Sequence, residues 1–317
     1  MLFDILTLAV GFLVLYYGAE YLVSGSINTS LTLGVNPVII GLTVVAFGTS
    51  LPELVVCLVA VYRQADDIAL GNVVGSNIAN IGLVLAAGAA LFTVTIQRRT
   101  FARDIPLMLI FSVVLLAVSH DGEISRIEGA LLVAGLLAFT VYCVKTASSH
   151  MDEMDIEAIE AEKKEHGDGL QKALLITALG IGGVLLGAHF LVESAISIAR
   201  ALHISELVIG MTIVAVGTSL PELATTVVAA YRKKSDIAVG NVIGSNIFNI
   251  GFVMGATSLA RPIPVGSGTW ANEMMVMLFF SVAVFPFAAM GRMGRIPGAA
   301  ILVGYLVFVL WQAGIFK

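Results

Sequence analysis

Charged residues are scarce in this sequence, and their scarcity excludes most classes of protein. Only 12% of the 317 residues are charged and 58% are hydrophobic, whereas a soluble domain carries roughly 25% charge. So few charges cannot cover the surface of water-soluble domains, and the outer surface must therefore meet lipid. The net charge of −5 argues against nucleic acid as a partner, because nucleic acid attracts basic surfaces. The composition predicts an integral membrane protein.

Cysteine is scarce too, and the usual enzyme motifs are missing. Cys57 and Cys143 lie in apolar runs with no metal-ligand spacing, so we expect packed thiols and no disulfide. An intramembrane hydrolase would need a nucleophile with a base or a zinc motif such as HExxH, and neither is found. We therefore expect a protein that is not an enzyme and needs no cofactor.

The chain consists of two similar halves. The run GLTVVAFGTSLPEL from Gly41 recurs as GMTIVAVGTSLPEL from Gly210, and GNVVGSNIANIG from Gly71 recurs as GNVIGSNIFNIG from Gly240. One offset of 169 residues relates both pairs without an insertion. An agreement of this extent indicates an internal repeat that covers nearly the whole chain.

Each half contains five apolar segments, each close to the length of about 20 residues that spans a membrane. They lie roughly at 2–24, 37–62, 69–93, 104–119 and 127–146, then at 173–199, 206–231, 238–260, 273–290 and 297–316. Because five is odd, two homologous halves must cross the membrane in opposite directions, as in many secondary transporters. The predicted fold is all-α, with ten transmembrane helices as two inverted five-helix repeats.

The loop charges predict the orientation of these helices. Loops after odd-numbered segments hold 12 Lys and Arg residues, and the other side holds 5. By the positive-inside rule, both termini lie outside and the central loop lies in the cytoplasm. The predicted division is a first repeat at 1–146, an acidic cytoplasmic linker at 147–172 and a second repeat at 173–317.

The linker is the only long polar stretch, and it carries eight acids. We interpret this stretch as a solvated linker or a short surface helix and not as a cation-sensing element, because it lacks the EF-hand spacing of acids around a glycine. The acids are Asp152, Glu153, Asp155, Glu157, Glu160, Glu162, Glu165 and Asp168.

Glu53 and Glu222 carry the strongest functional signal. Each lies midway along an apolar segment, where an ionised side chain costs at least ~2.5 kcal/mol and indicates function. In the first copy Thr49 lies four residues before Glu53 on one helix face, Ser50 lies beside it, and Pro52 leaves the carbonyl of Gly48 without its helical donor. The second copy repeats this with Thr218, Ser219, Pro221 and Glu222. Carboxylate, hydroxyl and free carbonyl oxygens at one depth are ligands for a hard cation.

The second motif adds more oxygen at a spacing of four. Ser76 and Asn80 share one helix face, as do Ser245 and Asn249. Asn77 and Asn246 are expected to point elsewhere. Glu20 and His189 align between the halves, and we expect them near the ends of their helices, with solvent contact or a role in ion access as the alternatives.

The paired GTSLPEL and GSNIxN motifs in two inverted halves closely resemble the α-repeats of the calcium/cation antiporter superfamily, in particular its prokaryotic sodium/calcium exchanger branch. The resemblance implies that Glu53 and Glu222 are central ligands for calcium and sodium, with Thr49, Ser50, Ser76 and Asn80 on one side. Thr218, Ser219, Ser245 and Asn249 would lie on the other side, and the carbonyls of Ala46 and Ala215 would join the sodium sites.

The same resemblance bears on the coupling ion. Some archaeal exchangers and the potassium-dependent branch have Asp where this chain has Asn249, which weakens the case for potassium cotransport. The proton-coupled branch has a further Glu in its second motif, and no acid occupies that motif here. Sodium is therefore the expected counter-ion.

The predicted function is antiport of Ca²⁺ against Na⁺ across the cell membrane by alternating access. Ca²⁺, Na⁺ and the lipid bilayer are the expected partners, and no obligate protein partner is predicted. A calcium/proton exchanger is the main alternative, because the same two glutamates could carry protons. A passive cation channel is the other transport alternative, and it would need no counter-ion.

Overall fold

The computed structural model describes residues 2–146, 169–202, 215–265 and 269–312. Within these ranges, eight helices are long and apolar enough to cross a membrane, and a ninth span is the bent pair Pro37–Thr49 and Leu51–Tyr62. The remaining predicted span, 206–231, which is the seventh along the chain, is described only from Ala215 onward. The eight linker acids also lie outside the described residues. The chain is an all-α membrane protein, as its composition predicts.

Helices account for nearly all of the described chain, and several of them contain a π-helical turn. The first half comprises α1 (Leu2–Leu33), α2 (Pro37–Ile40), α3 (Ala46–Thr49), α4 (Leu51–Tyr62), α5 (Asp66–Ala79), α6 (Ala86–Leu91), α7 (Ile105–Val118) and α8 (Arg126–Lys145). The second half comprises α10 (Leu170–Ala201), α12 (Ala215–Gly217), α13 (Leu220–Tyr231), α14 (Ser235–Phe248), α15 (Gly255–Ala260), α16 (Thr269–Ala283), α17 (Phe285–Ala289) and α18 (Arg295–Gln312). The π-helical turns are Gly41–Val45, Asn80–Leu85, Thr100–Asp104 and Asn249–Met254.

Helix α1 is nine residues longer than the segment predicted at 2–24. The prediction stopped where Ser and Thr residues begin, but these side chains bond back to the helix and so cost it little. Thr29 Oγ1 donates to the carbonyl of Gly25 at 2.8 Å, and Thr32 Oγ1 donates to the carbonyl of Asn28 at 2.8 Å. The polar residues therefore extend the helix beyond the apolar run.

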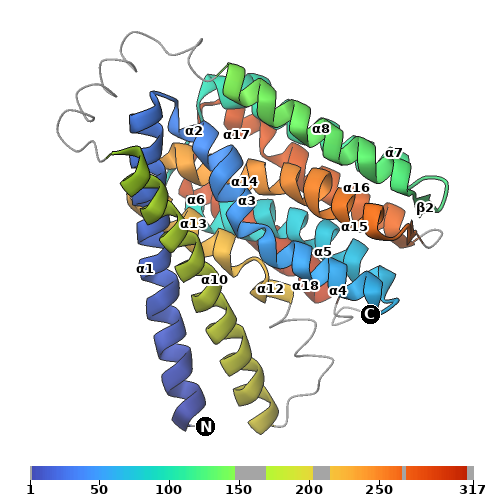
Figure 1. Ribbon diagram of the computed structural model, residues 1–317, viewed down its shortest axis with the longest axis horizontal. Helices are drawn as coiled ribbons and strands as arrows, with labels where there is room; N and C mark the ends of the chain where they lie inside the picture. The colour runs from blue at the N-terminus through green and yellow to red at the C-terminus, as the bar shows by residue number, and fades with distance from the viewer. Residues whose placement is uncertain (1, 147–168, 203–214, 266–268, 313–317) are drawn as a thin grey trace.

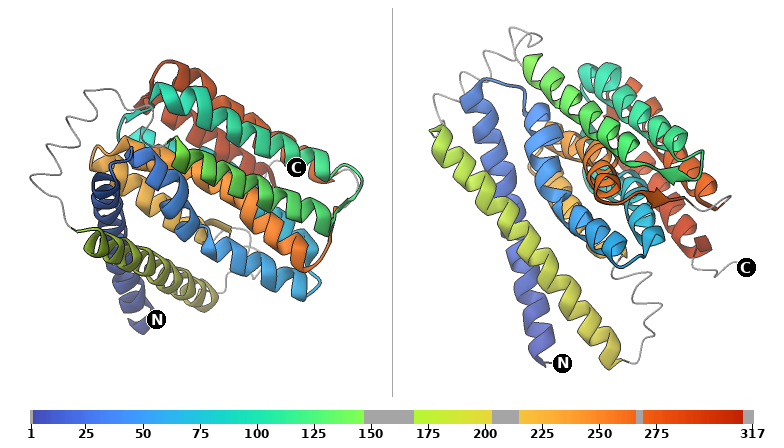
Figure 2. Two further views of the ribbon diagram at one scale, coloured as in Figure 1. Left: turned by 45° about the horizontal axis from the view of Figure 1, so that its top comes forward. Right: turned by 45° about the vertical axis from the view of Figure 1, so that its right-hand side comes forward.

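Helices α1 and α10 form a closely packed antiparallel pair beside the rest of the molecule (Figures 1 and 2). Small residues let the two backbones meet: a Cβ at Gly18 would lie 2.5 Å from the backbone nitrogen of Val184. A Cβ at Gly187, the repeat-related position, would lie 2.3 Å from the nitrogen of Leu15. Such contacts are typical of membrane helix pairs, where lipid supplies no hydrophobic drive for association.

Two long helices, each containing a π-helical turn, form the centre of the remaining bundle. The stretches Asp66–Leu91 and Ser235–Ala260 are mostly buried, whereas the other candidate spans are mostly exposed at the surface of the protein. Their exposed side chains are large and apolar, such as Phe3, Phe279 and Ile296. This distribution fits a molecule whose periphery faces lipid and whose two central helices are shielded from it.

Two short antiparallel ladders show how the halves are related. Strand β1 (Val94–Thr95) pairs with β4 (Arg292–Met293), and β2 (Glu123–Ile124) pairs with β3 (Ile263–Pro264). The repeat offset relates β1 to β3 and β2 to β4. Strand β1 therefore pairs with the counterpart of β2, and β2 pairs with the counterpart of β1. This exchange places the third loop of one half beside the fourth loop of the other, as inverted repeats require.

The helix of the segment predicted at 104–119 begins earlier, at Thr100, so Asp104 lies inside the helix and not at its start. The π-helical turn Thr100–Asp104 runs without interruption into α7. Asp104 is fully buried and pairs with Arg103. The ion pair explains why an acid is tolerated inside this helix.

Candidate functional site

The helix break that the prolines predict lies beside each glutamate. Between α3 and α4 the chain bends by 40°, and α4 begins with Leu51 and Pro52. Glu53 therefore occupies the first turn of a new helix, and Glu222 has the same place in α13 after Pro221. Free backbone N–H groups at a helix N-terminus favour negative charge. The fold thus positions two carboxylates where the backbone helps to hold them ionised.

The two glutamates are buried and close enough for their carboxylates to repel each other. Both side chains are 0% exposed. All four carboxylate oxygens lack a hydrogen-bond partner among the described residues. Two unpartnered charges are costly in a medium of low dielectric constant. A bound cation would satisfy them, so this pair is the centre of the candidate site.

Hydroxyl groups from both halves surround the pair. Thr49 Oγ1 lies 3.4 Å from Ser245 Oγ of the other half, and it approaches Glu222. Ser76 approaches Glu53 in the same way. Ser50 and Ser219 are buried and have unpartnered hydroxyl oxygens in the described structure. Residues predicted from two separate motifs thus come together around one point.

Asn80 and Asn249 supply two amide groups. Each begins a π-helical turn, a local widening that is frequent at functional sites. Both side chains are buried, and both Oδ1 atoms lack a hydrogen-bond donor among the described residues. These oxygens are therefore available as ligands.

The remaining predicted residues flank the break in each helix. Ala46 is buried, and its carbonyl accepts from the amide of Ser50 at 3.0 Å and from Thr49 Oγ1 at 3.4 Å. Thr218 lies in the break before α13 and is half-buried, and Ala215 begins α12. A carbonyl oxygen has two lone pairs, so a cation at the Ala46 oxygen would have to displace one of these two donors, of which the 3.4 Å contact from Thr49 is the longer.

Asn77 and Asn246 do not point elsewhere, and that prediction is wrong. Asn246 Oδ1 accepts from Asn80 Nδ2 at 3.0 Å, and Asn77 Oδ1 accepts from Asn249 Nδ2 at 3.5 Å. The prediction considered each helix face by itself, but these partners come from opposite halves. Asn77 lies on a different face of its helix from Asn80, and Asn246 from Asn249. Each nevertheless contacts the ligand asparagine of the opposite half, where the two repeats meet.

Asn72 and Asn241 are further polar neighbours that the sequence analysis missed. Asn241 Oδ1 accepts from Thr49 at 3.2 Å, while Asn72 Nδ2 donates to the backbone carbonyl of Glu53 at 3.4 Å. Each lies four residues before Ser245 or Ser76. Both asparagines continue the four-residue spacing of the serine and asparagine ligands by one step toward the N-terminus, and this spacing is the signal that identifies them in the sequence.

Glu20 lies in the middle of α1 and not near its end, because the helix is longer than predicted. Its carboxylate pairs with Arg232, which follows α13, and accepts from the hydroxyl of Tyr16 at 3.2 Å. His189 likewise lies within α10. Glu20 therefore contacts the bundle away from Glu53 and Glu222.

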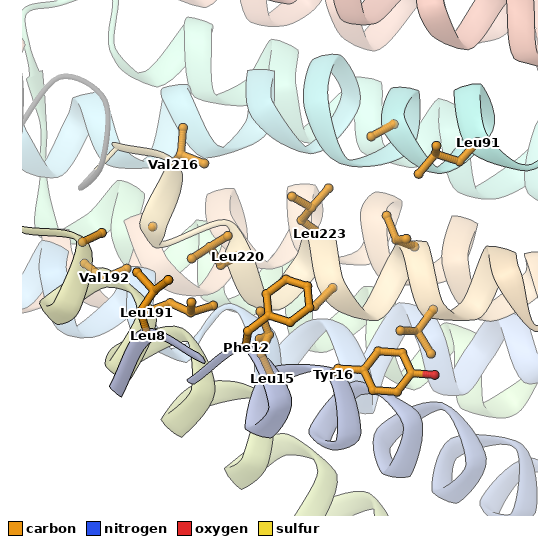
Figure 3. Close-up of a pocket in the computed structure, with 16 residues that line it drawn as sticks. Leu8, Phe12, Leu15, Tyr16, Leu91, Leu191, Val192, Val216, Leu220 and Leu223 are labelled. Carbon is orange, nitrogen blue, oxygen red and sulfur yellow. The ribbon is translucent and has the colours of Figure 1, made fainter. Parts of the chain in front are cut away.

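A separate cavity of about 590 Å³ lies between the α1–α10 pair and α13. Figure 3 shows its lining, in which Tyr16 is the one residue with a polar side chain. Leu220 and Leu223 reach it from α13, and Phe12 reaches it from α1. Such a lining suits hydrocarbon and offers no ligands to a bare ion.

The candidate site offers a cation few charged ligands. No group of three or more Asp, Glu, His or Cys residues capable of holding a metal occurs in the described ranges. The two carboxylates are accompanied by neutral hydroxyl and amide oxygens, and few charged ligands give calcium sites of modest affinity. A site of this kind can release its ion, as transport requires.

Comparison with known proteins agrees with this chemistry. The model of the family described as sodium/calcium exchanger protein matches residues 3–145 and 172–314. The inner membrane protein YrbG of Escherichia coli is 36% identical over 98% of this chain and 96% of its own length. The sodium/calcium exchanger MaX1 of Methanosarcina acetivorans is 31% identical over 97% of both.

Solved structures give the same result. A structure of the sodium-calcium exchanger NCX_Mj, soaked with 10 mM Na⁺ and zero Ca²⁺, superposes with a TM-score of 0.84 at 34% sequence identity. The match covers 96% of this chain and 97% of that one. The fold and the site thus define a cation/Ca²⁺ antiporter of the membrane, a transporter and not an enzyme. The chain belongs to the sodium/calcium exchanger family.

Proposed function

We propose that this protein exchanges Ca²⁺ for Na⁺, and that both ions use the site between Glu53 and Glu222. The observation that carries the proposal is the pair of buried carboxylates with four unpartnered oxygens. The ligands are the residues that the sequence singles out: Glu53, Glu222, Thr49, Ser50, Thr218, Ser219, Ser76, Asn80, Ser245, Asn249 and the carbonyls of Ala46 and Ala215. The printed names of NCX_Mj and MaX1, which are sodium/calcium exchangers, support the same pair of ions.

Charge explains how one ion excludes the other. Two ionised carboxylates contribute a charge of −2, which one Ca²⁺ neutralises. Three Na⁺ would leave the site at +1, so exchange at that ratio is electrogenic. Because both ions need the same oxygens, binding of one disfavours the other. The empty site keeps two close, buried negative charges, which oppose closure around it.

Alternating access is proposed to come from movement of α1 and α10 over the central bundle. The two helices pack backbone against backbone, so they are suited to move as one body. The two central helices, which carry the Ser and Asn ligands of the second motif, are the most buried candidate spans and form the natural fixed part. Sliding of packed helices is one of the recognised modes of such transitions.

The proposed arrangement comprises a first repeat at 1–146, a linker at 147–172 and a second repeat at 173–317. Both termini are placed outside and the linker in the cytoplasm of the cell. The excess of Lys and Arg in loops after odd-numbered spans supports this orientation.

The experiment that tests the function is uptake of radioactive calcium into proteoliposomes that contain the purified protein. Vesicles loaded with sodium are compared with vesicles loaded with potassium or choline, each with and without an imposed pH gradient. We expect uptake only when sodium is inside. Uptake driven by the proton gradient would establish the calcium/proton exchanger instead, and uptake with no counter-gradient would establish a channel.

A further inference from the structure

Two methionines outside the ligand set lie against the asparagines behind the site. Asn246 Nδ2 donates to Met108 Sδ at 3.5 Å, and Asn77 Nδ2 donates to Met277 Sδ at 3.6 Å. Met108 comes from α7 and Met277 from α16, and both are fully buried. The repeat offset relates the two contacts, so each half provides one thioether to an asparagine of the other half.

The sulfur determines which way each asparagine faces. A thioether accepts a hydrogen bond and has no proton to donate, whereas an amide carries donors on one arm and an acceptor on the other. Only the NH₂ arm of Asn246 can therefore face Met108 favourably. This orientation turns Oδ1 of Asn246 away from the sulfur and toward Asn80.

The same rule then orients the ligand. Asn80 must direct its own NH₂ arm to Oδ1 of Asn246, and the 3.0 Å contact shows this arrangement. The oxygen of Asn80 is left buried and without a donor in the described structure. Met277, Asn77 and Asn249 repeat the sequence of contacts in the other half. Each series of three contacting side chains, methionine to asparagine to ligand asparagine, thus ends with an unpartnered oxygen.

We propose that Met108 and Met277, acting through Asn246 and Asn77, are positioning residues that hold the oxygens of Asn80 and Asn249 toward the transported cation. The inference rests on the proposed function, since it assigns those two oxygens to the ion. Without the sulfur, either amide can rotate and present NH₂, which repels a cation. The outer helices α7 and α16 would thus control the ligands without touching the ion.

The test is equilibrium binding of radioactive calcium to the purified full-length protein, with thermal unfolding in the absence of calcium as a check on folding. The double variant Met108→Leu/Met277→Leu nearly conserves volume, which cores tolerate best, but removes both acceptors. We expect its Kd for calcium to rise about tenfold, the smallest effect typical of groups that orient metal ligands. In transport, KM should rise while the maximal rate is retained.

Met254→Leu is the matched control. Met254 is fully buried, and its sulfur accepts no hydrogen bond from the residues that the structure describes. The Met254→Leu variant should bind calcium like the unmodified protein. If Met254→Leu weakens binding as much as the double variant, the effect is one of packing and the proposal is wrong. Unchanged binding in the double variant would overturn it as well.

Asn246 provides a second, independent variant pair. Asn246→Leu removes the acceptor that faces Asn80 and should also weaken calcium binding about tenfold. Asn246→Asp keeps an oxygen in that place and should bind at least as tightly as the unmodified protein. Equal weakening in both would contradict the orienting role. Normal binding in both Glu53→Gln and Glu222→Gln would instead refute the proposed site itself, so the two failures are distinguishable.

Discussion

At the scale of single residues, the position of Glu53 and Glu222 in the first turn of a helix reconciles two opposing demands. The helix N-terminus stabilises their negative charge, while burial and mutual repulsion destabilise it. Because no protein group satisfies their oxygens among the described residues, the balance is left for an ion to complete. The oxygens of both glutamates are thus left available to a cation.

Replacing either glutamate by glutamine should therefore abolish most calcium transport. Glu53→Gln and Glu222→Gln each remove one of two charges and one anionic ligand. The apparent affinity for calcium should fall more than about tenfold, because about tenfold is the loss expected when a residue that only orients a ligand is replaced. Initial rates of calcium uptake in proteoliposomes measure the effect. Asp121→Asn, an exposed acid outside the site, is the control, and near-normal uptake in both glutamine variants would contradict the assignment.

The sequence singles out candidate ligands that the structure brings together, but it does not identify the residues that lie behind them. Glu53 and Asn80 were found because a polar residue in an apolar segment stands out and because the repeat presents it twice. Asn77 was missed since its partner, Asn249, belongs to the other half. Periodicity along one helix contains no information about which faces meet. Met108 gave no signal either, because a buried methionine is ordinary in an apolar segment.

At the scale of helices, the α1–α10 pair depends on positions where no side chain fits. A Cβ at Gly187 would lie 2.3 Å from a backbone nitrogen of α1, and backbone cannot move aside as a side chain can. The sequence predicted both segments but placed the end of α1 too early, because apolarity was used to set the boundary. Ser and Thr that bond to their own helix are not a boundary in a membrane.

Gly187→Ala should push the two helices apart and destabilise the protein by about 1–3 kcal/mol, the usual cost of overpacking. Thermal unfolding of the purified protein in detergent measures the change as a lower melting temperature. Gly182→Ala on the same helix is the control, because no described atom lies within 4 Å of a Cβ there. That variant should be neutral or slightly stabilising, as alanine favours helix over glycine. Equal melting temperatures for the two would contradict the packing argument.

At the scale of the whole molecule, the ladders β1–β4 and β2–β3 fix how the halves interlock. The sequence predicted inverted halves from the odd number of spans, but it gave no sign of the two-residue strands. Strands this short carry no periodic pattern, and they form only when loops from both halves meet. The proposed orientation places β1–β4 in the cytoplasm and β2–β3 outside.

Labelling with a membrane-impermeant maleimide tests this orientation in intact cells. Glu123→Cys in β2 and Arg292→Cys in β4 are both exposed positions, and each is introduced after Cys57 and Cys143 are replaced by alanine. We expect Glu123→Cys to react in intact cells and Arg292→Cys to react only after permeabilisation. The reverse pattern would show that both termini lie in the cytoplasm.

The pairing of the ladders has a consequence for the ancestry of the protein. Because β1 pairs with the counterpart of β2, and β2 with the counterpart of β1, two identical copies of one half could form both ladders. They would need only to insert in opposite directions. The present chain therefore has the arrangement of a dual-topology homodimer whose genes have fused. Because the first half has five spans, a second half joined directly to it keeps the opposite direction without an added helix.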